Sequence, residues 1–322
     1  MSEKVLNQAR KNKNDEFYTR YEDIEEEINR YVNYDKDVFK DKVVLLPCDD
    51  PEWSNFVKYF FDNFNNFGLK KLIASSFEVD GQGNYFIFDR GNIDSLKWGD
   101  YKALKLKGDG DYASKEVTAF RDEANFVITN PPFSKIKDFF PWIVEKEDVK
   151  FSIIAPMNCT TYERIFPYIK SRECWTGGGE KKKVNMDFKI PDKDFNRQTG
   201  ELGGFFKPGV TIWLTNIKDG IVLKDLELNT MAHNLEHNKK LKNKPHTYKK
   251  YLNYDAIEVP YVDAIPTDWD GLIAVPITFL LKDNRKQFEI VGKKDRGLNL
   301  GYDENGKMIM PYRRTIIRPI KN

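Results

Sequence analysis

The sequence predicts an α/β protein in which a Rossmann-like, doubly wound and mostly parallel sheet is followed by a smaller, irregular C-terminal module. Three observations support this prediction. Short apolar segments recur through the first two-thirds of the chain, and polar or amphipathic segments long enough for a helix separate them. Beyond about residue 218 this rhythm weakens and prolines become frequent. We therefore expect one domain over residues 1–217 and a second over residues 218–322.

The apolar segments of the first domain are expected to be its strands. They are Val43–Pro47, Leu72–Phe77, Leu104–Leu106, Phe126–Thr129, Phe151–Ala155 and Val210–Leu214. Helical spacing of apolar residues predicts the helices, at Tyr21–Tyr31, Asn55–Phe67, Ser134–Glu145 and Thr160–Lys170. We expect a hairpin insertion at residues 81–98 and a long loop at 176–208. Because ligands bind at the carboxyl ends of strands in such sheets, residues that follow a strand are candidate site residues.

The composition is that of a globular protein without a membrane span. Hydrophobic residues make up 40% of the 322 residues and charged residues 32%. No segment approaches the roughly 18 to 20 apolar residues that a spanning helix needs, and no secretory signal is recognisable. The cysteines, Cys48, Cys159 and Cys174, have neither metal-type spacing nor an even count. We expect a cytoplasmic protein with no membrane partner, no disulfide framework and no metal requirement.

The charges are segregated along the chain although the net charge is only +2. Six lysines and no acid lie within residues 239–250, and three lysines lie together within the long loop. Such segregation suits a protein with one face toward phosphates. Solvated lysine faces are an equally ordinary explanation of any one cluster. The lysines expected to contact phosphates are Lys181, Lys182, Lys183, Lys239, Lys240, Lys242 and Lys244.

The tetrapeptide Asn130-Pro131-Pro132-Phe133 directly follows an apolar strand. Two successive prolines fix the backbone and remove two N–H donors, so the turn is rigid and its carbonyl groups are free to accept. The side-chain oxygen of Asn130 and the carbonyl of Pro131 can accept the two hydrogens of an exocyclic amine, which leaves the nitrogen lone pair available for a methyl sulfonium. Phe133 offers a face on which a base can stack, once the base has been flipped out of the duplex. The alternative is an ordinary strand-ending turn.

A second motif, His233-Asn234-Leu235-Glu236-His237, matches the H-x-x-E-H pattern of inverted zinc peptidases. Two histidines four residues apart on a helix can share a metal ion. The surroundings are rich in asparagine and lysine and offer no apolar helix to hold the ligands. We therefore expect a polar helix that leads into the lysine segment, and no metal site.

The chain resembles the EcoRI-type adenine-specific DNA methyltransferases. The matching stretches are Asp15–Thr19, Cys48–Pro51 with Ser54–Phe56, Gly68–Ser75, Gly108–Asp111 and Thr129–Ser134, in this order. The resemblance implies a methyltransferase fold, S-adenosylmethionine as cofactor, and transfer to N6 of adenine within a short specific site of double-stranded DNA. It also implies a type II modification enzyme or a solitary or phage counterpart. We expect a monomer, with residues 218–322 as the DNA-recognition module.

The resemblance also indicates which residues hold the cofactor. Tyr18 and Thr19 match the segment that packs on its methionine part, although Asp15 or Thr19 can equally cap the following helix. Cys48, Asp49 and Asp50 stand where most such enzymes carry a glycine-rich turn, so a carboxylate is expected to anchor the cofactor's ammonium group. The remaining candidates are Glu78 or Asp80 for the ribose, Asp111 or Asp109 for the adenine amine of the cofactor, and Asn130.

Two alternatives to this function remain. The acceptor can be another planar amine, such as cytosine N4, an RNA base or a protein glutamine amide. The chain can also be a catalytically inactive DNA-binding protein, which the intact tetrapeptide disfavours. We expect the loop 176–208 to help hold the target, and Trp175, Phe188 and Phe195 are the candidates for the second face of the base.

Overall fold

The computed structural model describes residues 19–178, 186–189, 195–196, 201–206, 209–221, 223–283 and 286–320. The chain divides into two compact units. Unit 1 comprises Met1–Pro156 and Cys174–Ile221, and unit 2 comprises Met157–Glu173 and Val222–Asn322. The expected boundary at residue 217 lies close to the junction of the two units between Ile221 and Val222. The sequence gives no signal that residues 157–173 belong to unit 2. No helix among the described residues is long and apolar enough to cross a membrane.

Unit 1 is built on one eight-stranded sheet with the strand order β4-β3-β2-β1-β5-β6-β12-β7. Its strands are β1 (Val43–Leu46), β2 (Lys71–Ser76), β3 (Asn84–Asp89), β4 (Leu104–Lys105), β5 (Phe126–Thr129), β6 (Lys150–Pro156), β7 (Trp175–Thr176) and β12 (Thr211–Thr215). Neighbours among β2, β1, β5 and β6 are parallel, whereas β3 and β12 run antiparallel to their neighbours. Because β4 and β7 are antiparallel to β3 and β12, they point the same way as the central four. The prediction of a mostly parallel sheet is therefore confirmed.

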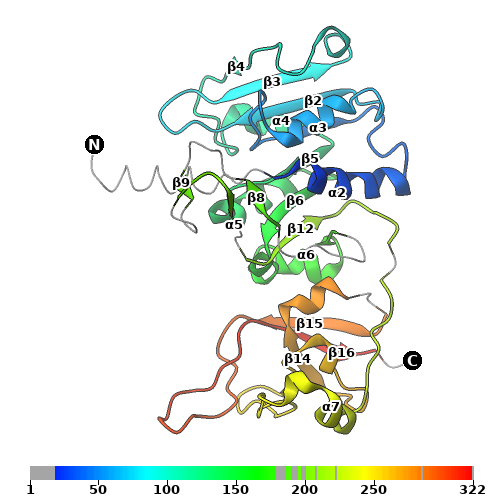
Figure 1. Ribbon diagram of the computed structural model, residues 1–322, viewed down its shortest axis with the longest axis vertical. Coiled ribbons are helices and arrows are strands. Elements are labelled where there is room, and N and C mark those ends of the chain that lie inside the picture. Colours follow the sequence, from blue (N-terminus) through cyan, green and yellow to red (C-terminus); the bar gives the residue numbers. More distant parts are fainter. Residues whose placement is uncertain are drawn as a thin grey trace. The chain divides into compact units, whose positions relative to one another are not determined.

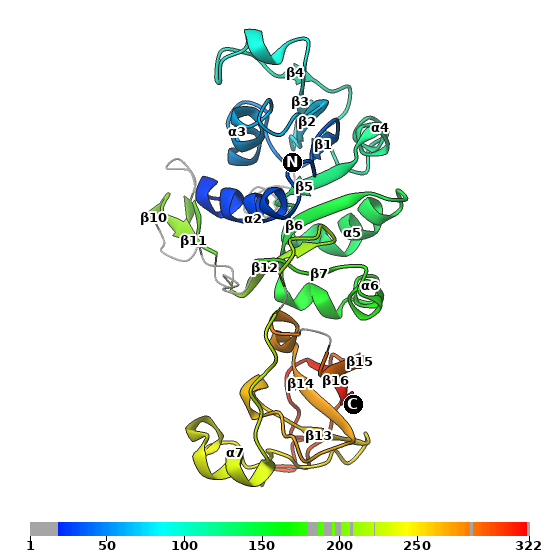
Figure 2. The same cartoon turned by 90° about the vertical axis from the view of Figure 1, so that its right-hand side faces the viewer.

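Helices cover both faces of this sheet (Figures 1 and 2). They are α2 (Tyr21–Tyr34), α3 (Asn55–Asp62), α4 (Lys115–Glu123) and α5 (Ile136–Val144). Figure 2 shows α2 and α3 on one face and α4 and α5 on the other, which is the doubly wound arrangement. The Ser54 hydroxyl caps α3 by accepting from Phe56 N–H at 3.1 Å. The Ser114 hydroxyl caps α4, a helix that was not predicted because its sequence is largely polar.

Two expectations about secondary structure are wrong in detail. The helix expected at Thr160–Lys170 is a 3₁₀ turn at Met157–Thr161 followed by α6 (Phe166–Ser171). Pro167 lies in the first turn of α6, where its fixed φ suits a helix start rather than an interior. The hairpin expected at residues 81–98 is a single strand, β3, that pairs with β2, followed by a 3₁₀ turn. The helix expected at Ser134–Glu145 is present as α5, and a 3₁₀ turn at Phe133–Lys135 precedes it.

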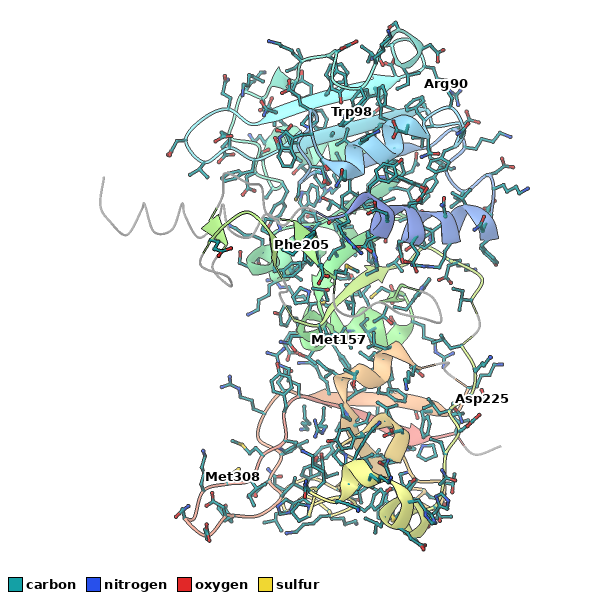
Figure 3. All side chains as sticks on the ribbon, viewed as in Figure 1. Arg90, Trp98, Met157, Phe205, Asp225 and Met308 are labelled. Carbon is teal, nitrogen blue, oxygen red and sulfur yellow. The ribbon has the colours of Figure 1, made fainter. Side chains whose placement is uncertain are left out.

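Among its described residues, the expected loop at 176–208 contains two small antiparallel sheets of two strands each. The strands β8 (Phe188–Lys189) and β11 (Phe205–Phe206) pair with each other, and β9 (Phe195–Asn196) pairs with β10 (Glu201–Leu202). Met186 and Phe188 are buried in the main hydrophobic core. Phe205, labelled in Figure 3, is 54% exposed. The β9–β10 pair lies between β8 and β11 in the sequence, and each pair is formed by residues that are not neighbours along the chain. The periodicity of apolar residues does not predict such pairing.

Unit 2 contains a four-stranded sheet with the order β13-β14-β16-β15. Its elements are β13 (Ala256–Glu258), β14 (Leu272–Pro276), β15 (Phe288–Lys294), β16 (Arg314–Pro319), α6, α7 (Met231–His237) and 3₁₀ turns at Met157–Thr161, Lys239–Leu241, Val262–Ala264 and Ile277–Leu281. A buried ion pair joins Arg314 of β16 to Glu258 of β13 at 2.5 Å, and the Tyr251 hydroxyl donates to the same carboxylate. The module is thus more regular than its proline-rich sequence suggests.

Candidate active site

The candidate site lies where the strand order of unit 1 reverses. After β1 the chain moves to β2 on one side, and β5 later joins β1 on the other side. Open α/β sheets bind ligands at such a switch point, outside the carboxyl ends of the strands. Cys48, Asp49 and Asp50 follow β1, and Asn130 and Pro131 follow β5. The reversal therefore brings the two most distinctive motifs of the sequence to one edge of the sheet.

Asp49 links the ends of these two strands. Its carboxylate accepts from the Thr129 hydroxyl at 2.6 Å and from the Ser54 hydroxyl at 2.7 Å. Only 6% of Asp49 is exposed. Burial raises the pKa of this carboxyl to about 7, against the opposing effect of the two hydroxyl donors and with a further increase from the nearby Asp50. Asp49 therefore fastens β1 to β5 while carrying a proton that near-neutral pH can remove.

Asp50 connects the same loop to the next two strands. One carboxylate oxygen accepts from Glu52 N–H at 2.9 Å. The other accepts from the Ser76 hydroxyl at 3.2 Å and from the Asn84 amide at 3.1 Å. The carboxylate is thus held at the mouth of the site by hydrogen bonds from the ends of β2 and β3.

Two glycines allow a second loop to approach the end of β2. A Cβ atom on Gly110 would lie 2.2 Å from the Ser76 carbonyl oxygen, and one on Gly83 would lie 2.6 Å from it. Gly110 also has a φ of +84°, which a residue with a side chain adopts only at a cost. The loop that carries Asp111 can therefore pack directly on the strand end only because these positions are glycine. The Asp111 carboxylate accepts from Ala113 N–H at 2.8 Å.

Two pockets of unit 1 open at this edge and share Cys48 and Asn130. One, of about 680 Å³, is lined by Pro47, Cys48, Phe77, Gly110, Asp111, Tyr112, Asn130, Pro132, Ser134 and Lys135. The other, of about 500 Å³, is lined by Thr19, Cys48, Asp49, Asp50, Trp53, Ser54, Asn55, Phe56, Ser76 and Asn130. The first pocket combines aromatic and proline surfaces with one carboxylate, and the second is rich in polar groups. A ligand with a flat ring system and a charged tail fits this division.

The tetrapeptide contributes its first and third residues to the pockets. Asn130 is half-buried and lines both of them, Pro131 is buried, and Pro132 lines the larger one. Among the described residues the Pro131 carbonyl accepts no hydrogen bond, whereas that of Pro132 accepts from Lys135 N–H at 2.9 Å. Phe133 packs against the main core and meets the edge of Phe188 with 6.3 Å between ring centroids. Phe133 lines neither pocket.

Of the other residues predicted to bind the cofactor, only some line a pocket. Thr19 lines the polar pocket, and its carbonyl accepts from the Asn55 amide at 2.8 Å. Its hydroxyl is buried and has no hydrogen-bond partner among the described residues. Thr19 does not cap the following helix, because Arg20 occupies the N-cap position. Glu78 is exposed and lines neither pocket, and Tyr18 lies outside the described residues.

Several residues that line the pockets were not predicted from the sequence. Phe77 and Tyr112 flank the larger pocket, and burial raises the pKa of the Tyr112 hydroxyl to about 12. Trp53 and Asn55 line the smaller one. Asn55 lies within the recognised stretch Ser54–Phe56, and Phe77 ends the expected strand Leu72–Phe77, so a helix start and a strand end are the signals that could have identified them. Tyr112 packs on Phe139 and Trp142 of α5, a contact that only the fold creates.

The basic segment of unit 2 is exposed, and the histidine motif precedes it. Lys239, Lys240, Lys242 and Lys244 are all exposed, whereas Lys181, Lys182 and Lys183 lie outside the described residues. His233 and His237 stand on α7 with 4.5 Å between ring centroids. The described part of the chain contains no group of three or more side chains able to hold a metal ion. The motif is a short polar helix leading into the lysine segment, as expected.

Comparison with known proteins extends the likeness to nearly the whole chain. The family model described as "Adenine-specific methyltransferase EcoRI" matches residues 5–315. Type II methyltransferase M.EcoRI of Escherichia coli is 37% identical over 98% of this chain and 96% of its own length. Type II methyltransferases M.MgeORF184P of Mycoplasma genitalium and M.MpnI of Mycoplasma pneumoniae are each 36% identical over 89% of this chain and 85% and 84% of their own. No solved structure matches.

The fold, the motifs at the switch point and these matches all indicate the same protein family. The sheet holds an Asn-Pro-Pro-Phe turn beside a carboxylate-bearing strand end, and the family model extends through both units. The chain belongs to the family of EcoRI-type adenine-specific methyltransferases.

Proposed function

We propose that this protein transfers the methyl group of S-adenosylmethionine to N6 of an adenine within a short specific site of double-stranded DNA. The observation that carries the proposal is the position of Asn130, which lines both pockets at the switch point of the sheet. A cofactor that occupies both pockets therefore passes Asn130, whose side-chain oxygen is the proposed acceptor for the target amine. In this role the protein is the modification enzyme of a restriction–modification system or a solitary counterpart, and it acts as a monomer in the cytoplasm.

The residues present fit S-adenosylmethionine. When bound, the cofactor supplies an electrophilic methyl group on a sulfonium. Asp49 and Asp50 provide negative charge for its ammonium group, and the buried Thr19 hydroxyl offers a hydrogen bond that no described residue takes up. The larger pocket suits its adenine, because Phe77 and Pro132 supply apolar surface and Asp111 an acceptor for the amine. Tyr18 and Glu78 are further candidates, the second for the ribose.

The tetrapeptide prepares the target amine for attack. The Asn130 side-chain oxygen and the Pro131 carbonyl each accept one amine hydrogen, which directs the nitrogen lone pair toward the methyl group. The rigid proline pair holds these acceptors in place before the base arrives, so little reorganisation accompanies transfer. Phe133 is the proposed stacking face for the flipped base, and Phe188, whose ring meets that of Phe133 edge to face, is one candidate for the second face.

Contacts to the duplex come from the basic segments. Lys239, Lys242 and Lys244 are exposed on unit 2 and are available to bind phosphates, and Lys240 is exposed but pairs with Asp263, which a phosphate would displace. The same role is proposed for Lys181, Lys182 and Lys183 in the segment outside the described residues. Phosphate contacts position the protein but do not read sequence. Residues 218–322 act as the recognition module that selects the site.

The decisive experiment compares Asn130→Ala with the native protein. Transfer of labelled methyl groups to DNA should fall by about 100-fold or more, the order of magnitude for losing one preorganised hydrogen-bond group. Affinity for DNA should stay within a few-fold, because the flipped base is the only part of the DNA that Asn130 contacts in this proposal. Asn65→Ala, a change at an exposed asparagine that lines neither pocket, is the matched control and should leave turnover unchanged.

Sequencing the modified bases in DNA from cells that express the native protein identifies the base, its position and the site together. Modified cytosine, or no modified adenine, would refute the proposed reaction. Undiminished turnover by Asn130→Ala would refute the mechanism while leaving the reaction standing.

A further inference from the structure

A β-hairpin between β15 and β16 projects from unit 2 at residues 299–310 (Figures 1 and 3, where Met308 is labelled). Its arms are joined by hydrogen bonds from Leu300 N–H to the Ile309 carbonyl at 2.9 Å and from Ile309 N–H to the Gly301 carbonyl at 2.8 Å. Asp303 N–H donates to the Lys307 carbonyl at 2.9 Å. The hairpin is thus a preformed ribbon rather than an irregular connection.

The turn of the hairpin is also defined. The Asp303 carboxylate accepts from Asn305 N–H at 2.9 Å and from Lys307 N–H at 2.8 Å. Gly306 has a φ of +74°, the left-handed conformation that this tight turn requires. One of the two acids in the hairpin is therefore occupied in closing the turn, which leaves Glu304 as the other.

Large apolar side chains stand exposed on this ribbon. Tyr302 is 59% exposed, Met310 52% and the following Tyr312 63%. Asn299, which is buried, donates to the Tyr302 hydroxyl at 3.3 Å and accepts from Gly301 N–H at 2.8 Å, so the tyrosine is held rather than loose. Several exposed apolar side chains on a rigid projection are typical of an interaction surface.

The base of the hairpin is joined to the lysine segment. Leu252 N–H donates to the Asn299 carbonyl at 2.8 Å, and the Asn253 amide donates to the Gly297 carbonyl at 2.6 Å. A Cβ atom on Gly301 would lie 3.4 Å from the Lys249 ammonium nitrogen. The exposed apolar ribbon and the cationic segment are therefore neighbours within unit 2.

The charge of this surface selects the kind of partner. Residues 239–254 and 296–313 together carry nine basic residues against the two acids Asp303 and Glu304. Within the described part of the chain, ion pairs engage only Lys240, Lys250 and Arg313 among the nine. The other six cations are Lys239, Lys242, Lys244, Lys249, Arg296 and Lys307. A polyanion with apolar surface between its charges complements this arrangement, and duplex DNA has both.

We infer that the hairpin at residues 299–310 enters the major groove of the target DNA, with Tyr302 and Met310 against the base edges and the adjoining lysines on the phosphates. The inference rests on the proposed function and names the element that reads the site. A two-stranded ribbon fits the major groove, about 12 Å wide, and base pairs are distinguishable there. The thymine methyl group is an apolar contact of the kind that Tyr302 and Met310 can make.

The test is the double variant Tyr302→Ala/Met310→Ala, with binding followed by fluorescence anisotropy. The probes are a labelled duplex containing the site found by sequencing and a duplex with that site permuted, at one salt concentration. Affinity for the specific duplex should fall by about tenfold or more, with less than about a twofold change for the permuted duplex. Binding of S-adenosylmethionine should be unchanged, which verifies that unit 1 is folded, and thermal unfolding should match that of the native protein, which verifies that unit 2 is folded too.

Two further variants sharpen the result. Leu104→Ala, at a residue that is 53% exposed in unit 1, is the matched control and should alter neither affinity. Lys242→Ala/Lys249→Ala should weaken binding to both duplexes equally. It should also lower the salt dependence by about 0.9 in log–log slope for each lysine that bound a phosphate.

The outcomes separate this inference from the proposed function. If the hairpin variant binds both duplexes as the native protein does, the hairpin does not read DNA and the inference is overturned, whether or not adenine is methylated. An equal loss for both duplexes would also overturn it, because the ribbon would then serve affinity without reading sequence. Failure of the native protein to methylate adenine would instead refute the proposed function itself.

Discussion

The buried carboxyl of Asp49 makes the stability of this protein depend on pH, and Asp49→Asn should remove that dependence. Asp49 is 6% exposed and accepts hydrogen bonds from the Thr129 and Ser54 hydroxyls. Burial raises its pKa from 3.8 to about 7. Asparagine has nearly the same shape and can still bond to both hydroxyls, which rotate to donate or accept. The substitution therefore removes the titration with little change in packing.

The sign and size of this pH dependence follow from the pKa values of Asp49 in the unfolded and folded protein. Between about pH 4 and about pH 7 the folded protein holds a proton on Asp49 that the unfolded chain does not. The free energy of unfolding therefore falls as pH rises through this range, by about 1.4 kcal/mol per unit. The total decrease in the free energy of unfolding is about 4 kcal/mol, and this decrease is complete above about pH 7. The asparagine of the variant cannot ionise, so the Asp49→Asn protein does not show this decrease.

Urea unfolding, followed by tryptophan fluorescence from about pH 4 to about pH 8, measures the effect. Asp49→Asn should match the native protein near pH 4 and exceed it by up to about 4 kcal/mol near pH 8. Asp100→Asn, at an exposed aspartate, is the control and should follow the native curve throughout. A difference between Asp49→Asn and the native protein that is constant over this range would show that the carboxyl is already ionised, and would refute the reasoning.

The same carboxyl connects stability to cofactor binding. A cation in the polar pocket favours the ionised form of Asp49, so binding of S-adenosylmethionine near pH 6.5 should release a proton. Calorimetry in two buffers of different ionisation enthalpy should detect this release with the native protein and not with Asp49→Asn. Equal proton release by both would place the titrating group elsewhere.

Two further substitutions test the loops around the site. Gly110→Ala should cost about 2–4 kcal/mol of stability and weaken cofactor binding, because it combines a positive φ with a steric clash. The control Gly99→Ala has a similar φ in open space and should cost only about 1–2 kcal/mol. Equal losses of stability in thermal unfolding would contradict the clash at Gly110. The buried Glu27 carboxylate accepts from Gly178 N–H at 2.9 Å and pairs with the largely buried guanidinium of Arg30. Glu27→Gln should therefore destabilise unit 1 by about 3 kcal/mol and speed hydrogen exchange at Gly178. The exposed Glu26→Gln is its control and should change stability by less than about 0.5 kcal/mol; unchanged exchange in Glu27→Gln would argue against the anchoring role.

Much of the candidate site was predictable because its signals are local. An apolar strand, a turn with two prolines and a helix that follows are consecutive in the chain at residues 126–144. Covalent geometry and side-chain periodicity determine such features over short distances. The same holds for Cys48, Asp49 and Asp50 after β1, and for α7 with its exposed lysines. Glu78 also follows a strand, yet its side chain is exposed, because following a strand does not determine which way a side chain points.

The tertiary structure decided what those local pieces do together. The sequence by itself determined the α/β class, the strand ends that line the candidate site, and the polar helix before the lysine segment. Only the fold placed β5 beside β1, so that Thr129 meets Asp49, and brought Asn84 of β3 to Asp50. The fold likewise decided the pairing of β8 with β11 and of β9 with β10, the assignment of residues 157–173 to unit 2, and the approach of Gly110 to Ser76. The physical reason is that strand pairing and close backbone approach depend on burial and hydrogen bonding between segments far apart in the chain, which a pattern read along neighbouring residues does not contain.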